Sequence, residues 1–179
     1  MEADNAISAG MCDMVAIDRG PIADLHWVNN AKSGHPVTQS IRCNVCHHQL
    51  WRFEPLCFSM NPYVLKEAFQ YLSVPSKKRK IIIIGAGPAG MRCTITASKR
   101  GHNVTIYEKK QYIRGMIYPG SRPKFKEDVA LALDWFKYEL GANNVKIELN
   151  TEVTPELVEI ISPDVLVIAV GAEWGEPYS

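Results

Sequence analysis

The second half of the chain alternates short apolar runs with longer segments of helical periodicity. Four consecutive isoleucines at residues 81–84 predict a strand that is buried on both faces, as strands of parallel sheets are. Further strands are expected at residues 103–107, 145–149 and 165–170. Strands that alternate with helices indicate an α/β fold with a parallel sheet, right-handed crossovers and helices on both faces.

Helical segments are expected between these strands. Residues 88–100 predict the first helix, and residues 155–161 predict a short one that Thr154 caps. The helix between them is amphipathic, and we expect it to end at Gly141. Its apolar face carries Phe125, Val129, Leu133, Phe136 and Leu140.

The first half of the chain is less regular. Residues 14–17 are apolar and predict a short buried strand that ends at the turn of residues 18–21. Residues 40–62 hold three cysteines and show little periodicity. A brief helix is expected at residues 64–72, and the basic, proline-containing residues 73–80 are typical of a linker.

Composition narrows the function classes. The chain has 179 residues, of which 46% are hydrophobic and 22% charged, as in globular proteins. Its formal net charge of +1 gives no positive field for nucleic acid. No apolar stretch approaches the roughly 20 residues that span a bilayer, and residues 1–5 lack the pattern of a signal peptide, so we expect a cytoplasmic protein without a membrane partner. In that reducing compartment, five cysteines favour thiols or metal ligands over disulfides.

The turn after the isoleucine strand carries the main candidate site. Its glycines meet three steric demands: a tight turn, close approach of backbone to a pyrophosphate, and close packing of a helix on the strand. The proline suits the first turn of that helix, where free amide hydrogens and the helix dipole favour an anion. The candidate cofactor-binding residues of the turn are Gly85, Ala86, Gly87, Pro88, Ala89 and Gly90.

Glu108 ends the second strand, eighteen residues after Gly90. A carboxylate here accepts hydrogen bonds from a ribose diol and repels a 2′-phosphate, which favours the adenosine of FAD or NAD over that of NADP. A glycine motif alone is weak evidence. A strand, the motif, a helix, a second strand and an acid, in this order, predict a site for an adenine dinucleotide.

A second candidate site is the segment from Cys43 to Cys57, whose fifteen residues hold three cysteines and two histidines. Two cysteines separated by two residues can direct both sulfurs at one metal ion or cluster corner. Iron–sulfur ligation, zinc ligation with one histidine, haem attachment at residues 43–47 and unliganded thiols are the alternatives, of which haem attachment would need an export signal. The candidate metal ligands are Cys43, Cys46 and Cys57.

Nearly the whole chain resembles the middle of the multidomain flavoenzymes typified by 2,4-dienoyl-CoA reductase and trimethylamine dehydrogenase. Residues 10–24 resemble the last strand of their old-yellow-enzyme barrel, where Arg19 matches an arginine that helps to hold the FMN phosphate. Residues 41–46 with Cys57 resemble the loop that ligates a four-iron four-sulfur cluster. The nucleotide domain of the family is matched, in order, by residues 85–90, Glu108, residues 149–154 and residues 163–172.

The resemblance implies a division of the chain and a direction of electron flow. In the parent enzymes, electrons pass from NAD(P)H through FAD and the cluster to FMN, which reduces an activated alkene or accepts electrons from an amine. The implied further cofactor-binding residues are Lys109, Gly115 and Gly171. The implied regions are the end of a TIM barrel that binds FMN (1–40), a cysteine-rich iron–sulfur loop with a linker (41–79), and an incomplete Rossmann-like domain for FAD or NAD(P) (80–179).

The chain departs from the family pattern at Asp18, where glycine usually precedes the arginine, and at Gln49 and Leu50, where the third loop cysteine would lie. We expect a piece of a longer enzyme whose barrel, FMN and NAD(P)H domain belong to the parent. Two hypotheses follow. The chain is a segment of a flavin-dependent oxidoreductase that supplies the adenosine half of an FAD site, or it is an inactive module that binds an adenine nucleotide, such as ADP, or a metal. Neither hypothesis names a catalytic residue.

Overall fold

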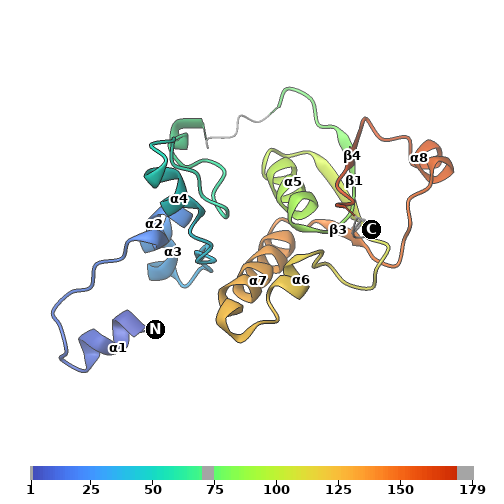
Figure 1. Ribbon diagram of the computed structural model, residues 1–179. Coiled ribbons are helices and arrows are strands. Elements are labelled where there is room, and N and C mark those ends of the chain that lie inside the picture. The colour runs from blue at the N-terminus through green and yellow to red at the C-terminus, as the bar shows by residue number, and fades with distance from the viewer. Residues whose placement is uncertain (1, 70–74, 173–179) are drawn as a thin grey trace. The chain divides into compact units, whose positions relative to one another are not determined.

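The computed structural model describes residues 2–69 and 75–172 and divides the chain into two compact units, Met1–Leu65 and Lys66–Ser179 (Figure 1). The boundary falls inside the segment 41–79 that the sequence predicts as loop and linker. The two units are described separately, beginning with the one that contains the sheet.

The second unit is built on a four-stranded sheet in the order β3-β2-β1-β4, with every neighbouring pair parallel. Ile83 of β1 lies beside Ile106 of β2 and Val167 of β4. The predicted parallel sheet is therefore confirmed. The strands are β1 (Lys80–Ile84), β2 (Asn103–Tyr107), β3 (Lys146–Glu148) and β4 (Val165–Ile168).

The isoleucine run forms the centre of this sheet because β1 has a hydrogen-bonded neighbour on each side. Ile82 and Ile83, whose side chains point to opposite faces, are 1% and 0% exposed. Ile106 of β2 is also fully buried. A continuous apolar run is what a strand covered on both faces requires, so the pattern and the burial agree.

Helices cover one face of the sheet well. α5 (Pro88–Lys99) contacts β1, β2 and α7 (Glu127–Ala142), and α7 buries Leu133, Phe136 and Leu140 as predicted. Arg92 of α5 places its guanidinium 4.6 Å from the ring centre of Trp135 on α7, which adds a cation–π contact between the helices.

Two details of the predicted amphipathic helix are wrong. Phe125 lies before the helix, in the short 3-10 turn η2 (Lys124–Lys126), and is 80% exposed. Gly141 does not end α7, which continues to Ala142; the left-handed residue that follows the helix is Asn144, with φ of 49°. Asparagine tolerates this conformation, so glycine is not needed for the stop.

The other face is less covered than the sequence predicts. α8 (Pro155–Ile161) lies on the opposite side of the strands from α5 in Figure 1, yet none of its residues is buried and Ile160 is 80% exposed. Leu166 and Ile168 of the edge strand β4 are exposed as well. The expectation of a second helical layer, and of a fully buried β4, is therefore wrong for the described residues, because α8 does not pack over these side chains.

The first unit is helical, with no strand among its described residues. Its apolar residues 14–17 form no strand because none lies beside them to pair, and Met14 is 82% exposed. The end of a barrel is thus not shown. The predicted helix at 64–72 crosses the boundary between the units and reduces to η1 (Glu67–Phe69) of the second unit, with residues 70–72 outside the described ranges. The helices are α1 (Glu2–Ser8), α2 (Arg19–Ala23), α3 (Trp27–Ser33) and α4 (Val45–Trp51).

Asp24 organises the centre of this first unit. Its carboxylate accepts hydrogen bonds from the backbone N–H of His26 at 2.9 Å, from Nδ2 of Asn30 at 3.1 Å and from the backbone N–H of Thr38 at 3.0 Å. One side chain thereby joins the end of α2, the helix α3 and the segment that follows. These hydrogen bonds accompany buried apolar side chains of the same unit, among them Phe58, Met60 and Val64.

Candidate functional site

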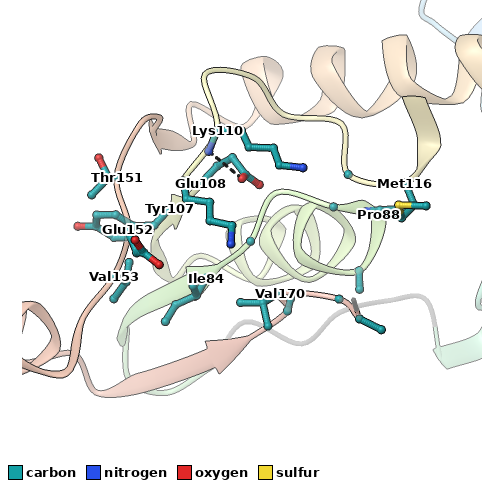
Figure 2. A pocket seen from close by; sticks show the side chains of 18 residues that line it. Ile84, Pro88, Tyr107, Glu108, Lys110, Met116, Thr151, Glu152, Val153 and Val170 are labelled. Carbon is teal, nitrogen blue, oxygen red and sulfur yellow. Dashed lines mark hydrogen bonds between the residues drawn. The ribbon is translucent and has the colours of Figure 1, made fainter. Parts of the chain in front are cut away.

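A pocket of about 380 Å³ opens at the carboxyl ends of β1, β2 and β4 (Figure 2). The chain passes from β1 to β2 and β3 on one side and then returns to β4 on the other, so the pocket lies where the strand order reverses. Ligands of open parallel sheets bind at such points. The volume falls in the lower part of the range of about 300–1,000 Å³ that is usual for small-molecule sites.

The glycine turn forms one wall of this pocket, and two of its glycines are required by packing within the chain. Gly85 has φ of 101°, and a Cβ there would lie 2.5 Å from the backbone oxygen of Ala169. A Cβ at Gly90 would lie 1.9 Å from the backbone oxygen of Gly85. The predicted roles of a tight turn and of close packing between helix and strand are therefore seen directly.

Gly87 differs from these two, because the atom nearest to an added Cβ is the Cα of Gly115, at 3.9 Å. Its backbone is extended, with φ of −78°, so neither strain nor crowding within the chain explains a glycine here. The space that a side chain would fill opens into the pocket, which Gly87 lines. A glycine at this point leaves room for a ligand to approach the backbone.

The first turn of α5 borders the same space. Gly87 is its N-cap, Pro88 its first residue, and no side chain caps it. The amide hydrogens of the first turn of a helix have no partner within that helix, and with the helix dipole they favour an anion. Pro88 has no N–H to donate, but Ala89 lines the pocket, which places its backbone N–H at the pocket's edge.

Glu108 is the acidic group of the site, and its side chain is fixed before any ligand binds. It is 9% exposed; its Oε2 accepts a hydrogen bond from the N–H of Ala86 at 2.9 Å, and its Oε1 accepts one from the N–H of Lys110 at 3.0 Å. Its backbone N–H donates to Glu148 at 2.9 Å, and its carbonyl accepts from Thr151 at 3.0 Å. Each carboxylate oxygen keeps a free lone pair, so the group can accept hydroxyl hydrogens from the pocket.

The structure divides the predicted cofactor-binding residues into two groups. Gly85, Gly87, Pro88, Ala89, Glu108, Lys109, Gly115 and Gly171 all line the pocket. Ala86 and Gly90 do not line it. Ala86 is fully buried and reaches the site through its hydrogen bond to Glu108, and Gly90 acts through the packing of α5.

Several lining residues were not predicted. Figure 2 shows Tyr107, Thr151, Glu152 and Val153 on one side of Glu108, and Pro88 and Met116 on the other. The three residues 151–153 follow β3 and reach the pocket because β3 pairs with β2 in parallel, which brings the ends of both strands to one edge. Two signals were available: the resemblance of residues 149–154 to the nucleotide domain of the flavoenzyme family, and the rule that ligands bind at the carboxyl edge of a parallel sheet.

The first unit holds the remaining predicted site residues, which the structure does not bring into a binding arrangement. Nη1 of Arg19 donates a hydrogen bond to Oδ1 of Asn44 at 3.2 Å. Cys43 is exposed and lies 3.1 Å from Oγ of Ser59, whereas Cys46 is buried in α4. Among the described residues, which include Cys57, no group of three or more His, Cys, Asp or Glu side chains is placed to hold a metal ion. The three cysteines are therefore not gathered into one ligand set among these residues, and their metal role stays a prediction.

The second unit is thus a parallel α/β domain of the dinucleotide-binding class, defined by its glycine turn, its helix start and its strand-end acid. Residues 80–118 match the family described as FAD binding domain. The matched residues include β1, the turn, α5, β2 and Glu108, which are the parts that build the pocket.

Longer proteins resemble the chain along nearly all of its length. A NADH oxidase of Thermoanaerobacter brockii is 33% identical over 96% of the chain and 27% of its own length. A cinnamate reductase of Clostridium sporogenes is 31% identical over 94% of the chain and 26% of its own length. The chain thus spans about a quarter of the length of these curated relatives.

A solved structure of a 2-naphthoyl-CoA reductase in complex with 2-naphthoyl-CoA is also similar, with a TM-score of 0.94 and 31% sequence identity. The match covers 98% of the present chain and 27% of the reductase chain. The chain therefore contains an FAD-binding domain like that of oxidoreductases such as these. The finer assignment to 2,4-dienoyl-CoA reductase or trimethylamine dehydrogenase stays a prediction. No helix in the described part of the chain is both long and apolar enough to cross a membrane.

Proposed function

We propose that the pocket binds the ADP portion of FAD. The observation that carries this proposal is the carboxylate of Glu108, which two backbone N–H groups hold at the edge of a pocket that also contains the start of α5. A buried carboxylate with a free lone pair on each oxygen is suited to the two hydroxyls of a ribose. The uncapped amides of α5 are suited to the pyrophosphate.

The remaining lining residues suggest where the base would lie. If the ribose lies at Glu108 and the pyrophosphate at Gly87, the adenine would occupy the remaining side of the pocket, which Tyr107 and residues 151–153 form. Lys109 and Lys110 also line the pocket and add positive charge beside the Glu108 carboxylate. This arrangement favours a nucleotide with a free ribose diol, because a 2′-phosphate would meet the carboxylate of Glu108.

The chemistry of the whole enzyme goes beyond this chain. When bound, FAD supplies hydride and electron transfer, whereas the residues of this pocket would bind and orient its ADP portion. We propose that the parent protein is an NAD(P)H-dependent flavin oxidoreductase that reduces an activated alkene, in keeping with the cinnamate reductase relative, or oxidises an amine. Electron transfer from FAD through an iron–sulfur cluster to FMN stays a prediction, because the described residues place no group of three or more metal-ligating side chains together.

Binding of ADP tests the proposal directly. Isothermal titration should detect ADP binding to the full chain, and ADP should raise the melting temperature because a ligand of the folded state stabilises it. Replacing Glu108 by Gln should weaken ADP binding about tenfold, since hydrogen bonds to a charged group contribute about 1.5–3 kcal/mol and a tenfold change in affinity is about 1.4 kcal/mol.

Two controls sharpen this test. Glu159→Gln removes an equal charge from the exposed helix α8, away from the pocket, and should leave ADP affinity unchanged. Adenosine 2′,5′-bisphosphate should bind the unsubstituted chain more weakly than ADP. Equal ADP affinity of the Glu108→Gln variant and the unsubstituted chain would refute the ribose assignment. An absorption spectrum with bound flavin supports the oxidoreductase segment, and a colourless chain that binds only ADP supports the inactive module.

A further inference from the structure

The loop beside the glycine turn contains an arginine held between two aromatic rings. The guanidinium carbon of Arg114 lies 3.2 Å from the ring centre of Tyr112 and 3.9 Å from that of Tyr118. Tyr118 belongs to α6 (Ile117–Gly120), so this arginine–tyrosine stack joins the loop to a helix. Stacking of this kind suits a planar guanidinium and orients the residue that carries it.

The next residue, Gly115, lies directly against the phosphate-binding turn. Its φ is 46°, and a Cβ there would lie 2.7 Å from the Cα of Gly87 and 3.3 Å from Cδ of Pro88. The two backbones thus touch where Gly87 and Gly115 both line the pocket. The position of residue 115 therefore sets how much of the Gly87 backbone a ligand can reach.

Among the described residues, Arg114 has no carboxylate partner that would explain its place. Its Nε is buried and makes no hydrogen bond to any described residue, and no ion pair involves it within the described ranges. Its guanidinium instead contacts the two tyrosine rings. The two rings hold the Arg114 side chain, and Gly115, the next residue, contacts the turn at Gly87. A single peptide unit therefore connects the stack to the pocket.

We propose that Arg114 is a positioning residue for the dinucleotide site: its stack between Tyr112 and Tyr118 holds Gly115 against Gly87 and keeps the start of α5 open to a diphosphate. The proposal rests on the proposed function, because it concerns the phosphate end of the same pocket. Its effect should be confined to ligands that carry the diphosphate, since Glu108 and residues 151–153 lie outside the stack.

The test compares ADP with adenosine in the full chain. The Arg114→Ala variant should bind ADP about tenfold more weakly, while its affinity for adenosine, measured by NMR titration, should change less than about twofold. Arg114→Lys keeps a cation between the rings and should recover most of the ADP affinity. A merely structural role would instead lower both affinities together with the melting temperature, and that result would overturn the proposal.

Arg122→Ala is the matched control, because the Arg122 guanidinium carbon lies 5.6 Å from the same Tyr118 ring without being enclosed by a second one. It removes the same charge nearby and should leave ADP affinity unchanged. Equal losses in the Arg122→Ala and Arg114→Ala variants would show a general charge effect and overturn the proposal.

If the Arg114→Ala variant does not fold, Tyr112→Leu tests the same proposal, because it removes one ring of the stack at a partly exposed position. It should weaken ADP binding about threefold and leave the affinity for adenosine unchanged. Unchanged ADP affinity of that folded variant would overturn the proposal. Failure of the proposed function itself looks different, because then the unsubstituted chain would not bind ADP at all.

Discussion

The two units of the chain differ in how far they bury their apolar runs, residues 81–84 in the second unit and 14–17 in the first. The second unit buries Ile82, Ile83 and Ile106 almost completely in its sheet. The first unit leaves Met14 82% exposed and Phe53 98% exposed, although its sequence also contains apolar runs. The first unit does bury Phe58, Met60 and Val64, but not its apolar run. An apolar run alone therefore does not ensure burial; in the second unit, pairing of β1 with strands on both sides contributes to it.

The same contrast applies to the candidate sites. In the second unit, eight predicted residues line one pocket, because parallel strands end at a common edge and their loops meet there. In the first unit, Arg19 contacts Asn44 and the cysteines assemble no ligand group among the described residues. A binding site needs side chains from separate elements at one place, and the sheet supplies that arrangement in the second unit.

The largest expected effect comes from shortening one apolar side chain in each unit, a buried one in the second unit and an exposed one in the first. Ile83→Ala deletes part of a fully buried side chain between Ile106 and Val167, and it should lower the free energy of unfolding of the second unit by about 2–5 kcal/mol. Met14→Ala deletes a similar volume from an exposed side chain and should change stability by less than about 0.5 kcal/mol. Urea unfolding followed by circular dichroism measures both.

The outcome that breaks the comparison is equal destabilisation by the two substitutions. It would mean that the apolar residues of the first unit contribute to a core as much as those of the sheet. The ADP-induced rise in melting temperature adds a second readout, because Met14→Ala should preserve it.

Much of the second unit could be predicted because its signals are local. The isoleucine run, the glycine spacing and Glu108 belong to one strand–helix–strand unit, and the structure confirms β1, α5 and β2 within one residue of the expected bounds. Each of these three elements contacts the other two, so the sequence signals and the contacts that fix this unit lie close together along the chain.

What could not be predicted depends on contacts between distant segments. Thr151, Glu152 and Val153 line the pocket only because β3 pairs with β2. The apolar pattern of β4 predicted burial, but Leu166 and Ile168 are exposed because α8 does not pack over them. A pattern shows that a residue is suited to burial, and tertiary packing decides whether something covers it.

A smaller effect is expected when the same substitution is made at two helical glycines of the second unit. Gly90→Ala places a Cβ 1.9 Å from the backbone oxygen of Gly85, which forces α5 away from the turn. Over-packing of this kind costs about 1–3 kcal/mol, and the displaced turn should no longer bind ADP. Thermal unfolding with and without ADP measures both consequences.

Gly141→Ala is the control for this substitution, since an added Cβ there meets nothing within 4 Å. It should stabilise α7 by up to about 1 kcal/mol, the advantage of alanine over glycine within a helix, and leave ADP binding intact. If Gly90→Ala kept full ADP affinity, the packing of α5 against the turn would not be what shapes the site.

The smallest expected effect is a difference in alkylation rate between two thiols, one from each unit. Burial raises the pKa of the Cys93 thiol on α5, so less of it is thiolate at a given pH, whereas Cys43 of the first unit is exposed. Because the thiolate is the reacting form, iodoacetamide at about pH 8 should modify Cys93 severalfold more slowly than Cys43, and the Cys93 rate should keep rising at higher pH. Peptide mass spectrometry of timed samples measures the two rates, which urea should make equal. Equal rates in the folded chain would show that α5 shields its thiol no better than the open loop of the first unit does.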